Sequence, residues 1–317
     1  MTHPSLAADF TPYGAPLGGS IDRILAWDFN AMKRAGEDTI TRFNAAGAQI
    51  PRQNRIQASV KQLERTRSKP FQIGPGYDSN EELLAECHRT LFEMHVIASN
   101  LDSNDDSRTL RDIAVMAGGP VLPSKDTFDR SRDIQAEQLA RSLFRAAGYR
   151  VDMAEPDLVL YRSGSPNLGV AVKRVTGDAQ YQKRVGKAED QLEMHNLDGF
   201  IVVNAQRFLT DAYFADRSVD LSAALFRKVS SWVRFLRPQR QLRVLAVVGI
   251  GTSFPFSTSR EGDATGCLLH FHSMYVAESD DDSRLQGVHA AASSMGIAMQ
   301  SSLRAVLSNA SHSAAAV

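Results

Sequence analysis

The sequence has few cysteines and no long apolar run. Two cysteines in 317 residues, Cys87 and Cys267, cannot build a disulfide framework, and neither lies in a CxxC or Cys/His pattern typical of zinc sites. The N-terminal segment has no basic stretch followed by an apolar one, and no window approaches the roughly eighteen apolar residues of a membrane span. These absences predict a cytoplasmic protein with no membrane partner.

A net charge is also absent. The chain has 36 Lys and Arg against 36 Asp and Glu, so it is not a polycation that coats nucleic acid, and an electrostatic partner must meet a local patch. There is no P-loop, so any ATP-driven step would come from another protein. Gly249-Ile250-Gly251 follows an apolar run but lacks the third glycine of the dinucleotide fingerprint, which argues against a nucleotide cofactor.

Turn-forming residues near position 120 divide the chain. Residues 1–20 are rich in Pro, Gly, Ala and Ser and predict a flexible arm. Residues 21–125 repeat apolar residues at helical spacing and predict a helical N-terminal domain. The run Gly118-Gly119-Pro120 and the later Pro123 interrupt any helix there, which puts the domain boundary near residue 125.

The remaining residues, 126–317, alternate between helical and strand-like periods. The expected helices cover 131–147, ending at Gly148, then 179–195 and 221–237, with a further helix from residue 287 into the tail. The expected strands cover 149–153, 157–162, 168–175, 199–204 and 242–250. This order predicts an α/β domain with a mixed sheet flanked by helices.

Two acids and one lysine are the candidate catalytic residues of this domain. Glu137 borders the apolar face of its predicted helix, near Ile134 and Phe144, instead of pointing straight to water. Asp157 opens one predicted strand, and Lys173 lies in the next, at a separation that a hairpin satisfies. Neighbouring strands can therefore present a carboxylate and an ammonium group side by side.

The residues Pro156-Asp157 and Ala171-Val172-Lys173 resemble the PD-(D/E)xK nuclease superfamily, which has the restriction-endonuclease-like fold. The resemblance implies that Asp157 binds a divalent metal, Mg²⁺ or Mn²⁺, that Lys173 helps to position or activate the attacking water, and that Glu137 on the preceding helix joins the metal. Hard oxygen ligands suit such an ion, which stabilises charge on a phosphodiester.

The sequence departs from this family at one position, because Ala171 stands where the second acid is expected. Side chains two apart on a strand share a face, so no carboxylate is provided there. The metal ligands would then be Asp157, Glu137 and the backbone carbonyl near Val172, with water. Three further residues are auxiliary candidates, one as a ligand and two as polar contacts at the start of the next helix: Glu155, Gln180 and Gln182.

Each of these residues also has a purely structural interpretation. Glu137 could pair with Arg141 on an exposed helix face. Asp157 could simply begin a strand, and Lys173 could be solvated on an edge strand. The histidine pairs His270/His272 and His88/His95 are more consistent with packing than with metal binding.

Basic residues gather in two runs. Between residues 221 and 259 there is no Asp or Glu, and a phosphate backbone is the expected partner of the cations in that run. A solvated helix packing its apolar side on the sheet is the alternative. A second run, 52–69, lies in the helical region. The nucleic-acid-binding candidates of the first run are Arg227, Lys228, Arg234, Arg237, Arg240 and Arg243.

The sequence therefore predicts a metal-dependent endonuclease that hydrolyses DNA. The resemblance and the missing P-loop suggest restriction or anti-phage defence, with an ATPase or helicase partner or as a homodimer, by analogy at the level of the fold. The alternative is a non-catalytic nucleic-acid-binding or scaffold protein on the same fold, as Ala171 suggests. A protein-interaction module that does not bind nucleic acid is a third interpretation.

Overall fold

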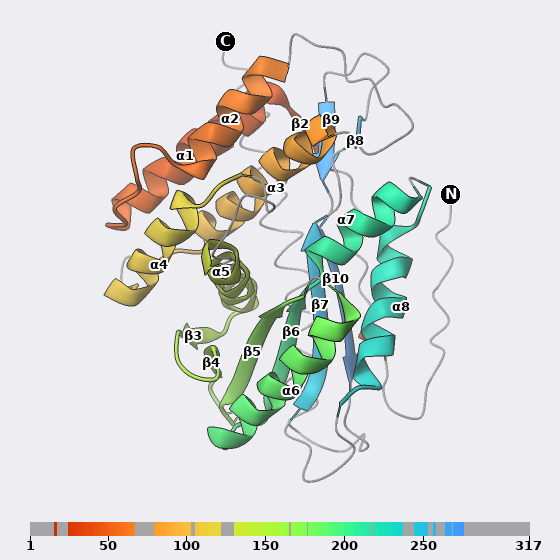
Figure 1. Cartoon of the computed structure of the whole chain (residues 1–317). Coiled ribbons are helices and arrows are strands. Elements are labelled where there is room, and N and C mark those ends of the chain that lie inside the picture. Colours follow the sequence, from red (N-terminus) through yellow and green to blue (C-terminus); the bar gives the residue numbers. More distant parts are fainter. Residues whose placement is uncertain are drawn as a thin grey trace.

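The structure is a computed structural model in which helices cover both faces of a mixed β-sheet (Figure 1). The α/β class, with a mixed sheet flanked by helices, is confirmed. The residues that it describes are 16–17, 25–66, 79–102, 105–121, 130–164, 166–175, 177–216, 218–236, 244–252, 256–257, 264–267 and 269–275.

The helices α1 to α4 form a layer at one end of the molecule, above the sheet in Figure 1. Their apolar sides meet α5 and one face of the sheet in a single hydrophobic cluster. The predicted boundary near residue 125 lies outside the described residues. The bounds are α1 (Phe29–Ala45), α2 (Arg55–Thr66), α3 (Ser79–Ser99) and α4 (Ser107–Gly118).

The main sheet has seven strands in the order β1-β10-β7-β6-β5-β4-β3. The strands β3, β4 and β5 form an antiparallel meander, β5, β6 and β7 run parallel, and β10 returns antiparallel to β7. The bounds are β1 (Pro16–Leu17), β3 (Arg150–Asp152), β4 (Leu158–Tyr161), β5 (Leu168–Arg174), β6 (Gly199–Asn204), β7 (Val244–Thr252) and β10 (Leu269–Tyr275).

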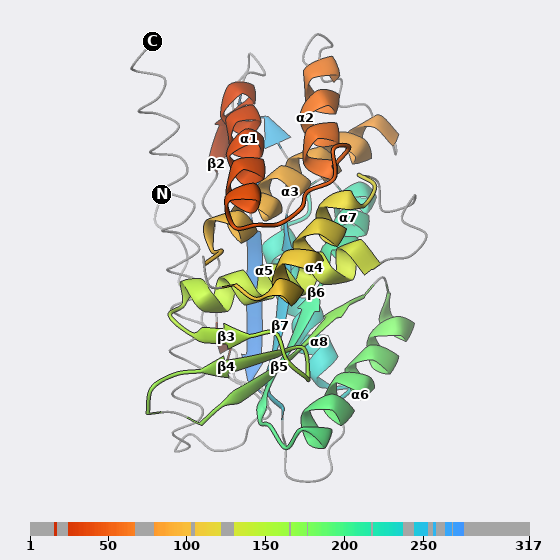
Figure 2. The ribbon, with the colours of Figure 1, turned by 90° about the vertical axis from the view of Figure 1, so that its left-hand side faces the viewer.

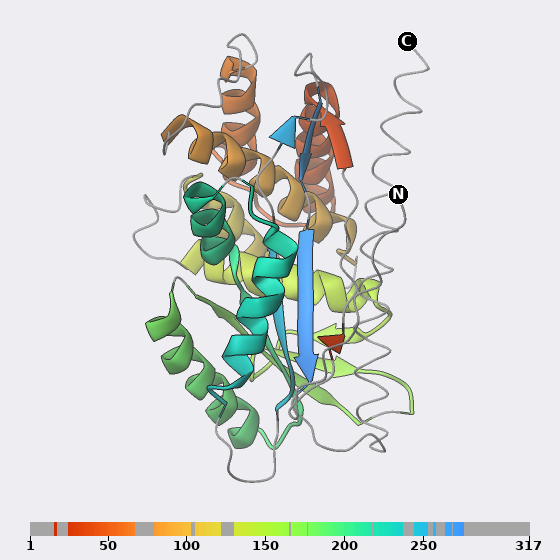
Figure 3. The ribbon, with the colours of Figure 1, turned by 90° about the vertical axis from the view of Figure 1, so that its right-hand side faces the viewer.

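Four helices connect or cover these strands. One face carries α5 (Arg130–Ala146), and the other carries α6 (Asp178–Met194), α7 (Gln206–Ala215) and α8 (Leu221–Val233), as Figures 2 and 3 show from opposite sides. A small sheet beside α3 contains β2 (Leu25–Asp28), β9 (Ala264–Cys267) and β8 (Phe256–Ser257).

The strand alternation divides the core into two clusters. On β5, Val170 and Val172 face α5, whereas Ala171 faces α6 and α8 and packs with Tyr181 and Trp232. The strands β6 and β7 are buried throughout because helices cover both faces of the sheet. This explains why their sequences are continuous apolar runs.

Two glycines let elements approach closely. A Cβ on Gly199 would lie 1.8 Å from the Gly169 carbonyl oxygen, where β5 and β6 meet. A Cβ on Gly249 would lie 2.4 Å from Val229 of α8. The Gly249-Ile250-Gly251 run therefore serves helix packing on β7.

Most predicted elements after residue 130 are present within a few residues. The helix over 131–147 ends as expected, with Gly148 at φ +86°, and the strand over 199–204 has the predicted bounds. The sequence interpretation missed α7 and the strands β2, β8 and β9. The helical prediction for 21–125 is wrong over β2, which is extended because it pairs with β9. Residues 16–17 of the predicted flexible arm pair with β10. The rest of the arm, residues 21–24 of the predicted helical domain, and the tail helix lie outside the described residues.

Candidate active site

The helix α5 holds Glu137 against the sheet. Its half-buried side chain does not use Arg141, which pairs with Asp105 at the end of the α3–α4 connection. The exposed i,i+4 pair that the structural interpretation required is therefore absent. Glu137 instead lies within electrostatic range of Asp157 and Lys173.

Asp157 and Lys173 are in direct contact. Asp157 Oδ2 accepts hydrogen bonds from Lys173 Nζ and from the Val172 amide, both at 2.7 Å, and Lys173 Nζ also donates to the Val172 carbonyl at 3.1 Å. The side chains are only 16% and 13% exposed. Because β5 lies between β4 and β6, Lys173 is not on an edge strand, and the solvated interpretation is wrong.

Burial and charge shift the two carboxyl groups. The pKa of Glu137 is raised from 4.5 to about 7, chiefly by desolvation and then by the charge of Asp157, while Lys173 opposes the increase. Desolvation also raises the pKa of Asp157, and Lys173 is the main opposing influence. A buried acid whose ionisation is disfavoured by burial and by a second carboxylate, beside one ammonium group, is an arrangement typical of functional sites.

Ala171 leaves this site without a third carboxylate. Asp157 precedes Leu158, which pairs with Val170, so Asp157 starts β4 beside Ala171. Ala171 is fully buried and belongs to the cluster under α6. The alanine at this strand position therefore supplies no oxygen ligand to the site.

The donors that remain suit a divalent cation with retained waters. Among the described residues, no group of three or more His, Cys, Asp or Glu side chains is placed to hold a metal ion. The candidate ligands are the carboxylates of Asp157 and Glu137 and the Val172 carbonyl. All three supply hard oxygen atoms, and Mg²⁺ is usually bound by a few protein oxygens while it keeps several waters. The raised pKa values also fit, because a bound cation would stabilise the ionised form of both buried carboxyl groups.

The auxiliary candidates lie further out. Glu155 is exposed, and its Oε2 is 3.4 Å from Gln191 Nε2, although its charge does raise the pKa of Asp157. Gln180 and Gln182 are exposed in the first turns of α6.

The predicted basic face is partly exposed. Arg227 on α8 and Arg234 directly after its end are exposed, and the apolar side of α8 packs on the sheet. Lys228 is half-buried and pairs with Asp178 Oδ1 at 2.5 Å. In the second basic run, Arg55 is buried at 1% exposure, so it is not available to a phosphate backbone. Three of the candidates fall outside the described residues: Arg237, Arg240 and Arg243.

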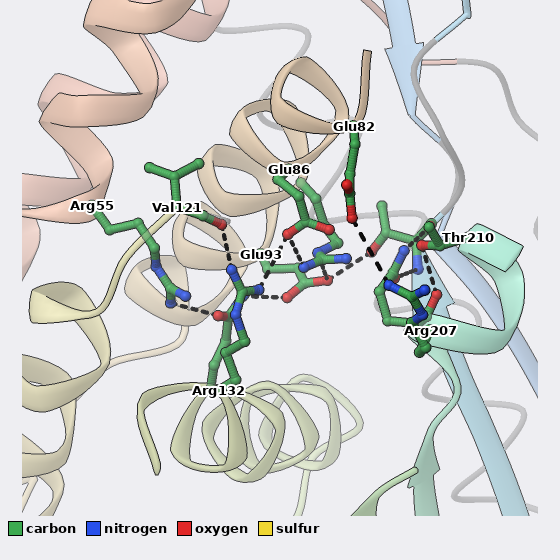
Figure 4. A network of polar contacts seen from close by, with 12 residues as sticks. Arg55, Glu82, Glu86, Glu93, Val121, Arg132, Arg207 and Thr210 are labelled. Carbon is green, nitrogen blue, oxygen red and sulfur yellow. Dashed lines mark hydrogen bonds and ion pairs between the residues drawn. The ribbon is translucent and has the colours of Figure 1, made fainter. Parts of the chain in front are cut away.

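A second polar cluster was not predicted from the sequence. We call it the Arg–Glu cleft; it encloses about 70 Å³ between α3, α5 and the ends of β5 and β6 (Figure 4). Its charged lining consists of Arg89, Arg132, Arg174 and Arg207 with Glu82, Glu86 and Glu93. The available signal was the helical spacing of the acids and Arg89 within the apolar run of α3, where buried charges require partners.

The remaining candidates are packing residues or fall outside the description. His88 and His95 are buried, and Thr39 Oγ1 lies 3.3 Å from His95 Nδ1. His270 and His272 lie on β10, but their side chains are not described. In the described part of the chain, none of the helices combines the length and apolarity needed to span a membrane.

Comparison with known proteins gives no match: no protein-family model, curated protein or solved structure is similar to this chain.

Proposed function

We propose that the protein is a metal-dependent phosphodiester hydrolase acting on DNA, with Glu137, Asp157 and Lys173 as its catalytic residues. The observation that supports this most directly is the buried Lys173 Nζ–Asp157 Oδ2 contact of 2.7 Å beside a second carboxylate. A purely structural pair would not need Glu137 nearby, because the charge of Asp157 raises the pKa of Glu137 and so disfavours its ionised form.

The restriction-endonuclease-like fold is part of the same proposal. It is supported by the order α5-β3-β4-β5-α6-β6, in which an antiparallel meander is followed by a helical crossover to a parallel strand. The sequence motif lies on this unit, with Glu137 on the helix and Asp157 and Lys173 at its adjacent strands.

Each residue has a distinct role. Asp157 and Glu137 would hold Mg²⁺ or Mn²⁺ together with the Val172 carbonyl. When bound, such an ion polarises the phosphodiester and lowers the pKa of its water. Lys173 holds Asp157 in place and adds positive charge where negative charge develops during attack. The Val172 amide fixes the orientation of Asp157 by a second hydrogen bond.

DNA binding is proposed for the exposed face of α8. Arg227 and Arg234 are the described cations of that face, and the same helix buries Leu225 and Val229 against the sheet. A rigid helix that presents guanidinium groups can contact phosphates without base readout.

The test is cleavage of plasmid and single-stranded DNA with Mg²⁺ or Mn²⁺. Asp157→Asn and Lys173→Met should each lower the rate by at least about 100-fold, since each removes a group acting on the reacting phosphate. Asp152→Asn on β3, which removes an exposed carboxylate, is the matched control and should retain activity. Wild-type cleavage that persists in both site variants would overturn the proposal.

A second candidate function is non-catalytic DNA binding on the same fold. It is favoured by the observation that Ala171 is buried in an apolar cluster and contributes no acid. It predicts DNA binding that weakens steeply with salt, without cleavage under any metal. Arg227→Gln and Arg234→Gln would then weaken binding, whereas Asp157→Asn would leave it unchanged.

A further inference from the structure

The Arg–Glu cleft lies where open α/β sheets place their ligands. It is formed at the carboxyl ends of neighbouring parallel strands, with Arg174 ending β5 and Asn204 ending β6. The helix α7 begins at Gln206 directly after it, so the positive end of that helix dipole faces the cleft. Crevices at this edge of a sheet are the usual ligand sites of such folds.

The inner wall of the cleft is a closed ionic network. Arg132 Nη1 lies 3.1 Å from Glu86 Oε2, and Arg89 pairs with Glu86 and lies 3.7 Å from Glu93 Oε1. Thr252 donates to Glu93 Oε1 at 2.9 Å. These side chains are nearly inaccessible, so they fix the position of the wall and are not exchanged for a ligand.

The outer arginines are held differently. Arg174 Nε bonds Asp133 Oδ1 at 2.8 Å, and Arg207 Nε lies 3.0 Å from Asp211 Oδ1, and neither aspartate lines the cleft. Within the cleft, Arg207 Nη1 also lies 3.9 Å from Glu82 Oε1 (Figure 4). Both aspartates are well exposed, at 38% and 52%. The exposed Arg207–Asp211 pair contributes little to stability, so a stronger acceptor can replace its carboxylate. Arg174 is 13% exposed, but its partner Asp133 is 38% exposed, so this carboxylate too can give way to a stronger acceptor.

The lining carries an excess of positive charge, and the space suits a small anion. Four arginines face three glutamates, which leaves one positive charge in the lining. The 70 Å³ cavity compares with roughly 10–15 Å³ for one water on the same measure. A network that only joined α3 to α5 would not need this open volume.

We propose that the Arg–Glu cleft binds a phosphate group, with Arg174 and Arg207 as its direct contacts and Arg132 as the fixed positive charge behind them. Guanidinium groups bind phosphate oxygens in pairs and more strongly than a single exposed carboxylate. The phosphate could belong to a free mononucleotide or to a DNA backbone, since α5 and β5 carry both this cleft and the carboxylate–lysine site. The proposal concerns binding and does not depend on hydrolysis.

The test is isothermal titration of the full chain in EDTA, which suppresses any cleavage. The probes are inorganic phosphate, AMP, adenosine, and a short DNA oligonucleotide without terminal phosphates. Arg174→Gln and Arg207→Gln each remove one guanidinium at the mouth of the cleft and should weaken binding about tenfold. Arg150→Gln is the matched control, because that side chain is 71% exposed on β3 and lies outside the cleft lining.

The outcomes separate the two sources of phosphate. Binding of inorganic phosphate and AMP but not adenosine, weakened by both cleft variants and not by Arg150→Gln, supports a free phosphate monoester. Binding of the oligonucleotide alone, with the same dependence on the cleft arginines, supports a backbone phosphate. No binding by any probe at millimolar concentration overturns the proposal, and so does binding that both cleft variants leave unchanged. Far-ultraviolet circular dichroism of each variant confirms that it is folded.

Discussion

Lys173 Nζ lies 2.7 Å from Asp157 Oδ2 inside the sheet, and this one contact joins β4 to β5 at the candidate site. Both side chains are largely buried, so each charge depends on the other for its stability. The Val172 backbone contributes to both, because its amide donates to Asp157 and its carbonyl accepts from Lys173. The pair is therefore a structural feature as well as a candidate catalytic one, and the two roles can be measured apart.

The first prediction concerns folding. Asp157→Ala should lower the free energy of unfolding by about 3 kcal/mol, because it leaves a buried ammonium group without its carboxylate. Asp157→Ala combined with Lys173→Met should cost less than Asp157→Ala alone, since both charges are then removed. Urea unfolding measures both values.

As a control, Arg150→Ala breaks an exposed pair and should change stability by less than about 1 kcal/mol. A double variant less stable than Asp157→Ala would contradict the buried-pair interpretation.

The second prediction concerns Glu137 and pH. The fold raises the pKa of this group from 4.5 to about 7, so the folded state favours its neutral form. That contribution to stability is fully present below pH 4.5 and is lost as the pH rises through 7. Glu137→Gln should therefore be more stable than the wild type at pH 8, by up to about 3 kcal/mol, and nearly equal at pH 4.

Thermal or urea unfolding across this pH range, without added metal, tests the Glu137 prediction. Glu155→Gln is the matched control, because that acid is exposed, and its stability should follow the wild type. Equal stability of Glu137→Gln and the wild type at pH 8 would show that Glu137 is not held in an unfavourable environment.

The sequence predicted the α/β core well because its signals are local. The β6 run is uniformly apolar between turn residues, and Gly148 takes the left-handed conformation at the end of α5. Asp157 and Lys173 were predicted to meet because two consecutive strands with a short turn have few arrangements open to them. Their contact follows from hairpin pairing.

The parts that were missed depend on long-range contacts. The strand β10 pairs with β7, and β2 pairs with β9 from the other end of the chain, which no local period reveals. Arg132 meets Glu86 from a separate helix 46 residues earlier. Arg141 likewise pairs with Asp105 and not with Glu137. This pairing depends on the packing of α4 against α5, which the i,i+4 spacing of Glu137 and Arg141 does not reveal.

The third prediction concerns acid stability. Burial lowers the pKa of His88 from 6.5 to about 4, so the folded state disfavours its protonated form. The stability conferred by the neutral ring is present above pH 6.5, declines as the pH falls, and has been lost below pH 4, a change of roughly 3 kcal/mol. His88→Gln should unfold with a weaker dependence on pH between 6.5 and 4. His195→Gln is the control, because that residue is exposed after α6. An unchanged acid profile for His88→Gln would contradict the prediction.

The last prediction restores the missing acid at Ala171. Ala171→Asp places a carboxylate on the same face of β5 as Lys173, in a position that is fully buried. In EDTA the variant should be less stable by about 2–4 kcal/mol, because an added charge is desolvated and crowds the cluster under α6. Saturating Mn²⁺ should recover much of this loss, since an ion that binds only the folded state stabilises it by about 2.7 kcal/mol at 100 times its Kd. Ala171→Asn has nearly the same volume without the charge, so Mn²⁺ should stabilise it less, through Asp157 and Glu137 alone. If Mn²⁺ stabilises Ala171→Asp no more than Ala171→Asn, the side chain at position 171 does not reach the ion; if Mn²⁺ stabilises neither variant, Asp157 and Glu137 are not its ligands.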